Sequence, residues 1–156
     1  MFERADAFVF GRRTYVLMAG FWPKVTDPGG AVAGRLNGLP KHVASTTLRA
    51  PSWQRSAVID GDVAEGVAEL KQREGGELQI HGSPHLARSL MANDLIDTFR
   101  LLTFPVVLGR GRRLFDNAVP PTALTLTEAR TTPSGVALRT YELAGRPTFG
   151  SVEGVD

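Results

Sequence analysis

One stretch near the beginning of the chain decides the fold: Ala5-Asp6-Ala7-Phe8-Val9-Phe10-Gly11-Arg12-Arg13-Thr14-Tyr15. Its apolar run, residues 7–10, is short and stops at a glycine, after which polar residues follow. This pattern predicts a buried strand, a glycine turn and the start of a helix. A helix start presents unpaired N–H groups and a partial positive charge, so this junction suits a phosphate group. Arg12 and Arg13 would add charge-assisted contacts.

The same design recurs in Gln79-Ile80-His81-Gly82-Ser83-Pro84. A strand is predicted over residues 77–81, with Leu78 and Ile80 facing inward. Ser83 is a typical side-chain N-cap and Pro84 a typical first helical residue. The buried side of that helix is predicted to hold Leu86, Leu90 and Met91. We name residues 11–14 the first helix start and residues 82–86 the second. For each of them, a phosphate site and a plain turn remain open as interpretations.

The other periodic segments place the two helix starts in an α/β domain. A helix is predicted after Asp62, which with Glu65 forms a capping-box-like pair, and Gly75-Gly76 is predicted to end it. Further strands are predicted at residues 41–45, 57–59, 98–104 (extended over 105–108), 124–128 and 135–143, and a short helix at 31–37. The order predicts a mixed, mostly parallel sheet with helices on both faces and an antiparallel hairpin at the end. One domain is expected over residues 1–144, with a mobile tail over 145–156.

Composition excludes several classes of protein. The chain has 156 residues, 18 basic and 16 acidic side chains, a net charge of +2 and no cysteine. Disulfides and cysteine-based zinc sites are therefore excluded. No apolar run approaches a membrane span, and the first residues lack the layout of a signal peptide, so we expect a soluble cytoplasmic protein and no membrane partner.

Other patterns point only weakly to chemistry. Arg110, Arg112 and Arg113 are a weak signal for nucleic acid, and we expect no nucleic-acid partner. His81 and His85 have a metal-like spacing, but a glycine and a proline separate them, so no metal site is expected.

The ordered blocks resemble the bacterial dihydrofolate-reductase-like family, which includes the reductase domain of the bifunctional riboflavin-biosynthesis deaminase-reductase. The first block is the stretch quoted at the outset. The others follow in order at residues 39–48, 80–86, 94–97 and 105–115. The resemblance covers residues 1–143 and implies a dihydrofolate-reductase-like fold.

This resemblance also implies an NADPH site assembled from three places. Gly11, Arg12, Arg13 and Thr14 would meet the cofactor phosphates; Ser45 and Thr46 would meet the adenosine ribose and its 2′-phosphate; Gly82, Ser83 and Leu86 would meet the pyrophosphate. Many relatives carry a basic residue at the position of Thr46. Preference for NADPH over NADH would then depend on Arg12 or Arg49.

The front of the chain departs from the family pattern. Relatives have a central strand, a loop and most of a helix before the block that here begins at residue 5. That strand forms much of the nicotinamide and substrate pocket, so no catalytic residue is carried over. We expect the chain to be a fragment of a longer protein, or to have its gap filled by another segment.

The resulting hypothesis is an NADPH-dependent reductase that transfers a hydride to a small heterocyclic substrate (pterin-like or riboflavin-precursor-like) or a carbonyl substrate. The alternative is a non-catalytic nucleotide-binding or structural remnant of that family. A homodimer is expected, because the late hairpin should lie at a sheet edge.

Overall fold

The computed structural model describes residues 2–25, 30–115 and 119–150 of the 156. The chain forms two compact units, residues 1–95 and 96–156, and each is described by itself. The first unit contains η1 (Phe2–Arg4), β1 (Ala5–Gly11), α1 (Arg12–Phe21), η2 (Trp22–Lys24), α2 (Ala31–Gly38), β2 (Lys41–Ala44), β3 (Ser56–Val58), α3 (Val63–Lys71), β4 (Glu77–Gln79) and α4 (Pro84–Ala92). The second contains β5 (Thr98–Thr103), β6 (Leu124–Thr131) and β7 (Ala137–Leu143).

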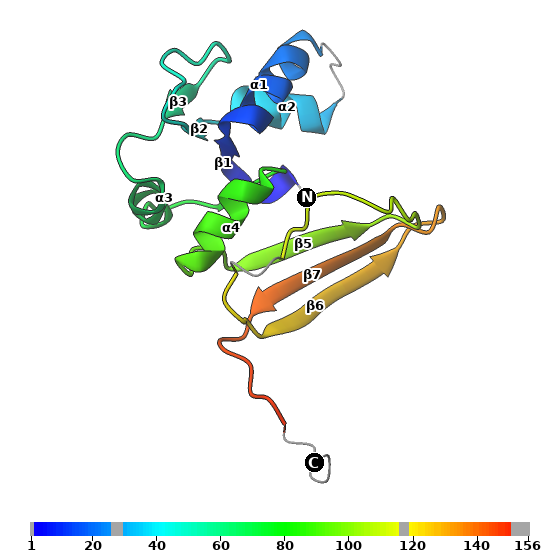
Figure 1. The fold of residues 1–156 in the computed structure, drawn as a ribbon. Helices are drawn as coiled ribbons and strands as arrows, with labels where there is room; N and C mark the ends of the chain where they lie inside the picture. Colours follow the sequence, from blue (N-terminus) through cyan, green and yellow to red (C-terminus); the bar gives the residue numbers. More distant parts are fainter. Residues whose placement is uncertain (1, 26–29, 116–118, 151–156) are drawn as a thin grey trace. The chain divides into compact units, whose positions relative to one another are not determined.

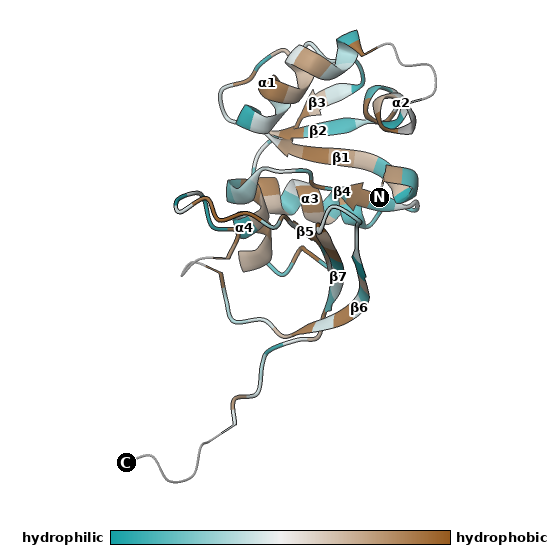
Figure 2. Ribbon diagram, turned by 90° about the vertical axis from the view of Figure 1, so that its right-hand side faces the viewer, coloured by the Kyte–Doolittle hydropathy of each residue, from teal (hydrophilic) through white to brown (hydrophobic). Residues whose placement is uncertain are grey.

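The first unit is built on a four-stranded parallel sheet in the order β3-β2-β1-β4. The helices α1 and α2 lie on one side of this sheet and α3 on the other (Figure 1). The strand β1 is covered on both faces, since Phe8, Val9 and Phe10 have no exposed surface. Figure 2 shows the apolar β1 with β2 on one side of it and β4 on the other. A continuous apolar run is what a central parallel strand requires.

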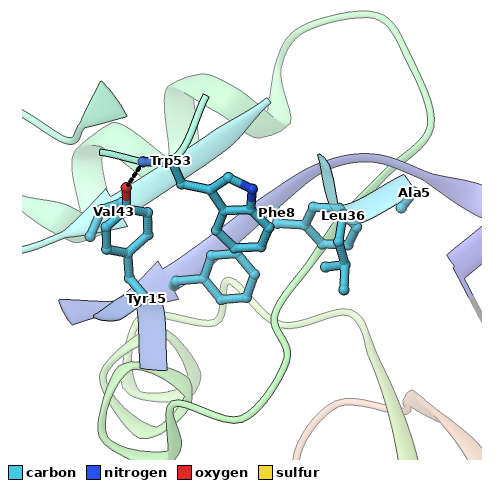
Figure 3. Packing of buried hydrophobic residues seen from close by; sticks show 7 residues of the cluster. Ala5, Phe8, Tyr15, Leu36, Val43 and Trp53 are labelled. Carbon is cyan, nitrogen blue, oxygen red and sulfur yellow. Dashed lines mark hydrogen bonds between the residues drawn. The ribbon is translucent and has the colours of Figure 1, made fainter. Parts of the chain in front are cut away.

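Aromatic side chains fill the core between β1 and the helices α1 and α2. Phe8 and Phe10 pack with Tyr15 from α1, Leu36 from α2 and Trp53 from the loop after β2 (Figure 3). The Phe10 and Trp53 rings are stacked with centroids 6.2 Å apart. The Tyr15 hydroxyl accepts a hydrogen bond from the Trp53 backbone N–H at 2.8 Å, which satisfies two polar groups inside this apolar cluster.

The second unit is a three-stranded antiparallel sheet in the order β5-β7-β6. The predicted hairpin is confirmed: β6 and β7 pair, and Thr132 and Gly135 close the turn by a hydrogen bond of 2.9 Å. Gly135 has φ +82°, a conformation that favours glycine. The strand β6 forms one edge of this sheet, as predicted for the hairpin.

The predicted α/β fold class is confirmed, with one difference in the sheet. We expected one mixed sheet, whereas the described residues form a parallel and a separate antiparallel sheet. The expected tail, residues 145–156, falls partly outside the described residues. No helix in the described part of the chain is long and apolar enough to cross a membrane.

Three local predictions were wrong. The helix α3 ends at Lys71, before Gly75-Gly76, whose turn is instead held by the Asp6 carboxylate as it accepts from the Gly76 N–H. In β4 the buried side chain is that of Gln79, while Leu78 is only half-buried. The strand β5 ends at Thr103, and residues 105–108 are irregular: Val107 and Leu108 are 95% and 77% exposed. There the apolar run does not mark a buried strand.

Candidate functional site

The topology of the parallel sheet brings the predicted site segments to one edge. From β1 the chain proceeds to β2 and then β3 on one side, whereas β4 lies on the other side of β1. The strand order therefore reverses between β1 and β4. In open α/β sheets, ligands bind outside the carboxyl ends of the strands at such a point. Both predicted helix starts follow the carboxyl ends of these two strands.

The two helix starts touch each other. The Gly11 N–H donates a hydrogen bond to the Ser83 Oγ at 2.9 Å, across 72 residues of sequence. A Cβ added at Gly11 would lie 3.4 Å from that Oγ, and one added at Gly82 would lie 3.5 Å from the Thr14 methyl group. Both distances are ordinary van der Waals contacts, so the two segments pack against each other, and the φ of +64° at Gly82 favours glycine there. The pair of segments predicted separately from sequence forms one site.

Neither helix start carries a side-chain cap. The helix α1 follows Gly11, which has no side chain, and Ser83 does not cap α4. The prediction that the Ser83 side chain caps α4 is therefore wrong. The Ser83 backbone is left-handed (φ +54°), and its hydroxyl accepts a hydrogen bond from the Gly11 N–H instead. In α3, by contrast, Asp62 accepts from the Ala64 and Glu65 N–H groups, as predicted. The backbone N–H groups that begin α1 and α4 remain suited to an anion.

The donors at these two helix starts can be specified. At α1 they are the N–H groups of Arg12, Arg13 and Thr14, the first three helical residues. At α4 the first helical residue is Pro84, which has no N–H, so His85 and Leu86 supply the donors. The Leu86 side chain is 7% exposed and packs inward, so only its backbone can meet a ligand.

The first helix start contains two arginines. The side chains of Arg12 and Arg13 are exposed, and neither has a hydrogen bond or an ion pair with another described residue. Arg35 and Arg55, in contrast, donate to the carbonyls of Glu3 and Gly38. The guanidinium groups of Arg12 and Arg13, together with the two uncapped helix starts, make the electrostatic potential positive at the carboxyl ends of these strands.

The third predicted segment lies next to the first. Gly11 and Ala44 are register partners at the ends of β1 and β2, so Ser45 and Thr46 follow directly beside the first helix start. The Ser45 Oγ accepts from the Thr47 and Leu48 N–H groups at 3.2 and 2.9 Å and so shapes the turn after β2. The Thr46 side chain is exposed.

A buried lysine that sequence reasoning missed anchors the loop after this turn. Lys41 has no exposed surface, and its ammonium group donates to the carbonyls of Asn37, Leu39 and Gln54 at 3.3, 2.8 and 3.0 Å. Burial, with a smaller effect of the nearby Arg55 charge, lowers the pKa of Lys41 to about 8. The contacts tie the end of α2 to the far end of the loop that begins with Ser45. In β2 burial alternates, so Lys41 and Val43 share the buried face.

Burial also lowers the pKa of His42, on the opposite face of β2, with a further contribution from Arg73. In the described residues, no group of three or more His, Asp or Glu side chains could hold a metal ion.

The three arginines considered as a weak signal for nucleic acid belong to the second compact unit; they are Arg110, Arg112 and Arg113.

Comparison with known proteins places this fold and site in a family. The family described as the RibD C-terminal domain matches residues 1–138, and the chain belongs to this family. It is therefore a reductase-like domain, as the sequence resemblance implied.

Two relatives come from Bacillus subtilis (strain 168), and both are described as uncharacterised. YyaP is 30% identical over 145 residues, covering 92% of this chain and 77% of that protein. YwjB is 41% identical over 59 residues, 38% of this chain and 34% of that protein.

Solved structures show the same fold at low sequence identity. A Shewanella sp. PV-4 protein described under riboflavin biosynthesis has a TM-score of 0.72 at 23% identity, covering 91% of this chain and 76% of that one. A pyrimidine reductase-like protein from Corynebacterium diphtheriae has a TM-score of 0.61 at 16% identity, with coverage of 89% and 76%. A diaminohydroxyphosphoribosylaminopyrimidine deaminase/5-amino-6-(5-phosphoribosylamino)uracil reductase from Thermotoga maritima has a TM-score of 0.56 at 16% identity. The last comparison covers 89% of this chain and 45% of the Thermotoga maritima protein.

Proposed function

We propose that this chain binds NADPH across the two helix starts and is the nucleotide-binding part of a reductase of small heterocyclic or carbonyl substrates. One observation carries the proposal: two uncapped helix starts are joined by the Gly11–Ser83 hydrogen bond at the reversal point of a parallel sheet. Two adjacent helix starts match two linked phosphates, because each can direct N–H donors at one phosphate group. The family membership supports reductase chemistry.

The residues present fit a dinucleotide phosphate. The two helix starts are in contact, because a Cβ at Gly11 or Gly82 would lie at van der Waals distance from the other segment, and neither glycine places a side chain between them. Arg12 and Arg13 supply positive charge for a ligand with several negative charges. When bound, NADPH would supply the hydride. The chain's own residues would hold its phosphates, and the turn shaped by Ser45 would face its adenosine part.

Preference for NADPH over NADH requires a partner for the 2′-phosphate. Thr46 is exposed and can donate one hydrogen bond, but it brings no charge. Arg12 begins α1 beside the end of β2, and Arg49 is exposed in the loop that Ser45 begins. We assign the selection of the 2′-phosphate to these arginines, with Thr46 as a neutral contact.

Binding and turnover are tested separately. Calorimetric titration with NADPH and with NADH should show binding of NADPH and weaker binding of NADH. Loss of NADPH absorbance should then be followed with a panel of pterins, pyrimidine precursors of riboflavin and simple carbonyl compounds. Binding without turnover on any of them would favour the non-catalytic alternative. No binding of either dinucleotide would overturn the proposal.

A further inference from the structure

We infer that Ser83 is a positioning residue that fixes the second helix start against the first, and that it sets affinity for the diphosphate through Gly11 rather than by contacting the ligand. This inference rests on the proposed function. It concerns the role of one side chain that the family resemblance would place among the phosphate contacts.

The hydroxyl oxygen of Ser83 is directed at the first helix start. The Ser83 side chain is buried (6% exposed), and its Oγ lies 2.9 Å from the Gly11 nitrogen. Gly11 pairs with Ala44 at the ends of β1 and β2, and its N–H donates on the other side, to the second helix start. The bond therefore continues the lateral contact between β1 and β4 after β4 has ended at Gln79.

The backbone of Ser83 has an unusual conformation. Its φ of +54° and ψ of +53° are left-handed, a conformation that side-chain-bearing residues rarely adopt. An N-cap serine normally has an extended backbone and accepts from its own helix. Here the left-handed backbone diverts the hydroxyl from α4 to α1. Unfavourable backbone conformations persist where surrounding contacts impose them, and they concentrate at functional sites.

The bond between Gly11 and Ser83 matters most for a ligand with two linked phosphates. The bond links the two sets of donors, those of Arg12 to Thr14 and those of His85 and Leu86. A ligand with two linked phosphates needs both sets at a fixed separation, whereas a single phosphate needs only one. Loss of the Ser83 hydroxyl should therefore weaken binding of a diphosphate ligand and spare a ligand that lacks the diphosphate.

The main test uses Ser83→Ala and Ser83→Gly with two probes, NADP⁺ and adenosine 2′-monophosphate. Both variants should weaken NADP⁺ binding roughly three- to tenfold, the usual scale for one lost hydrogen bond, and leave adenosine 2′-monophosphate unchanged within about twofold. Ser83→Gly is the discriminating variant. Glycine adopts the left-handed backbone readily, so this variant keeps the backbone conformation and loses only the hydroxyl group that accepts from Gly11. The matched control is Ser89→Ala, an exposed serine of the same helix, which should change neither affinity.

A measurement on the ligand-free protein separates positioning from direct contact. The Gly11 N–H donates to the Ser83 hydroxyl, so Ser83→Ala and Ser83→Gly should both speed hydrogen exchange of the Gly11 amide in the absence of any ligand. Ser89→Ala should leave the exchange of that amide unchanged.

The possible outcomes are distinct. Wild-type affinity for NADP⁺ in Ser83→Gly would overturn the positioning role, and so would equal losses for both probes. A loss of NADP⁺ affinity in Ser83→Ala with unchanged hydrogen exchange of the Gly11 amide would show direct contact with the ligand and would also overturn it. Failure of the wild-type protein to bind NADP⁺ would contradict the proposed function itself, and this inference with it.

Discussion

The ammonium nitrogen of Lys41 lies 4.6 Å from the centre of the Trp53 ring, and both residues are almost fully buried. The pKa of Lys41 in the folded protein, about 8, is below its ordinary value of 10.5. Between these two values the unfolded chain binds more protons than the folded chain, so this group makes stability rise with pH. Below pH 8 the cost of burying the charge is fully present.

A comparison with Lys41→Met tests this sign. The melting temperature of the wild-type protein minus that of Lys41→Met should rise between about pH 8 and pH 10.5, because methionine does not titrate. The corresponding change in the free energy of unfolding should be about 1–3 kcal/mol. Thermal melts of both proteins across this range give the difference directly. A difference that falls over the same range would contradict the lowered pKa.

We expect Arg12→Ala to weaken NADPH binding by about 1–3 kcal/mol, the scale of a charge-assisted contact. The fold should be little affected, because the Arg12 side chain is exposed and has no partner among the described residues. Arg139→Ala is the matched control: it removes an exposed arginine from β7 in the other compact unit. Isothermal titration that gives equal affinities for both variants would remove Arg12 from the site.

Local sequence patterns predicted both helix starts because each is encoded within about ten residues. The apolar run before Gly11, and Pro84 after Ser83, set these junctions without help from the rest of the chain. The hydrogen bond from the Gly11 N–H to the Ser83 hydroxyl could not be predicted from the sequence. That bond joins residues 72 positions apart and depends on a left-handed backbone that favours glycine or asparagine over serine.

Two other features show the same limit. Asp6 lies in the stretch that decided the fold, but its carboxylate holds the Gly76 N–H in a turn that precedes β4. Lysine side chains are usually exposed, and the three carbonyls and the Trp53 ring around the Lys41 nitrogen account for its burial. Non-local partners decided both roles.

The homodimer predicted from sequence gains a specific candidate surface. The strand β6 is an eight-residue edge strand, and its Leu126 side chain is 51% exposed. Unpaired edge groups invite pairing with another chain. Light scattering at tens of micromolar protein should give the mass of a dimer, and Leu126→Lys should shift it towards the monomer. Leu17→Lys, at an exposed position of α1, should leave the mass unchanged. A monomer mass for the wild-type protein would contradict the prediction.

The same substitution in two helices should have opposite effects on stability. Gly34 lies in α2 with nothing near the position that a Cβ would occupy, whereas in α3 a Cβ at Gly66 would collide with the Ile59 Cγ2 methyl group. Alanine is favoured over glycine inside a helix, so Gly34→Ala should stabilise the protein by about 0.5–1 kcal/mol. In Gly66→Ala the same gain is opposed by overpacking, which typically costs about 1–3 kcal/mol. Because Ile59 is β-branched, its methyl group cannot move far without turning the whole side chain.

The net result expected for Gly66→Ala is destabilisation of up to about 2 kcal/mol. Urea unfolding of the two variants beside the wild-type protein gives both free energies of unfolding under identical conditions. Gly66→Ala,Ile59→Val is an insufficient relief, because valine keeps a Cγ2, whereas Gly66→Ala,Ile59→Ala removes the colliding methyl group. The collision should therefore appear as a favourable coupling between the two alanine substitutions. Stabilisation by Gly66→Ala alone would mean that α3 does not pack closely on the segment after β3.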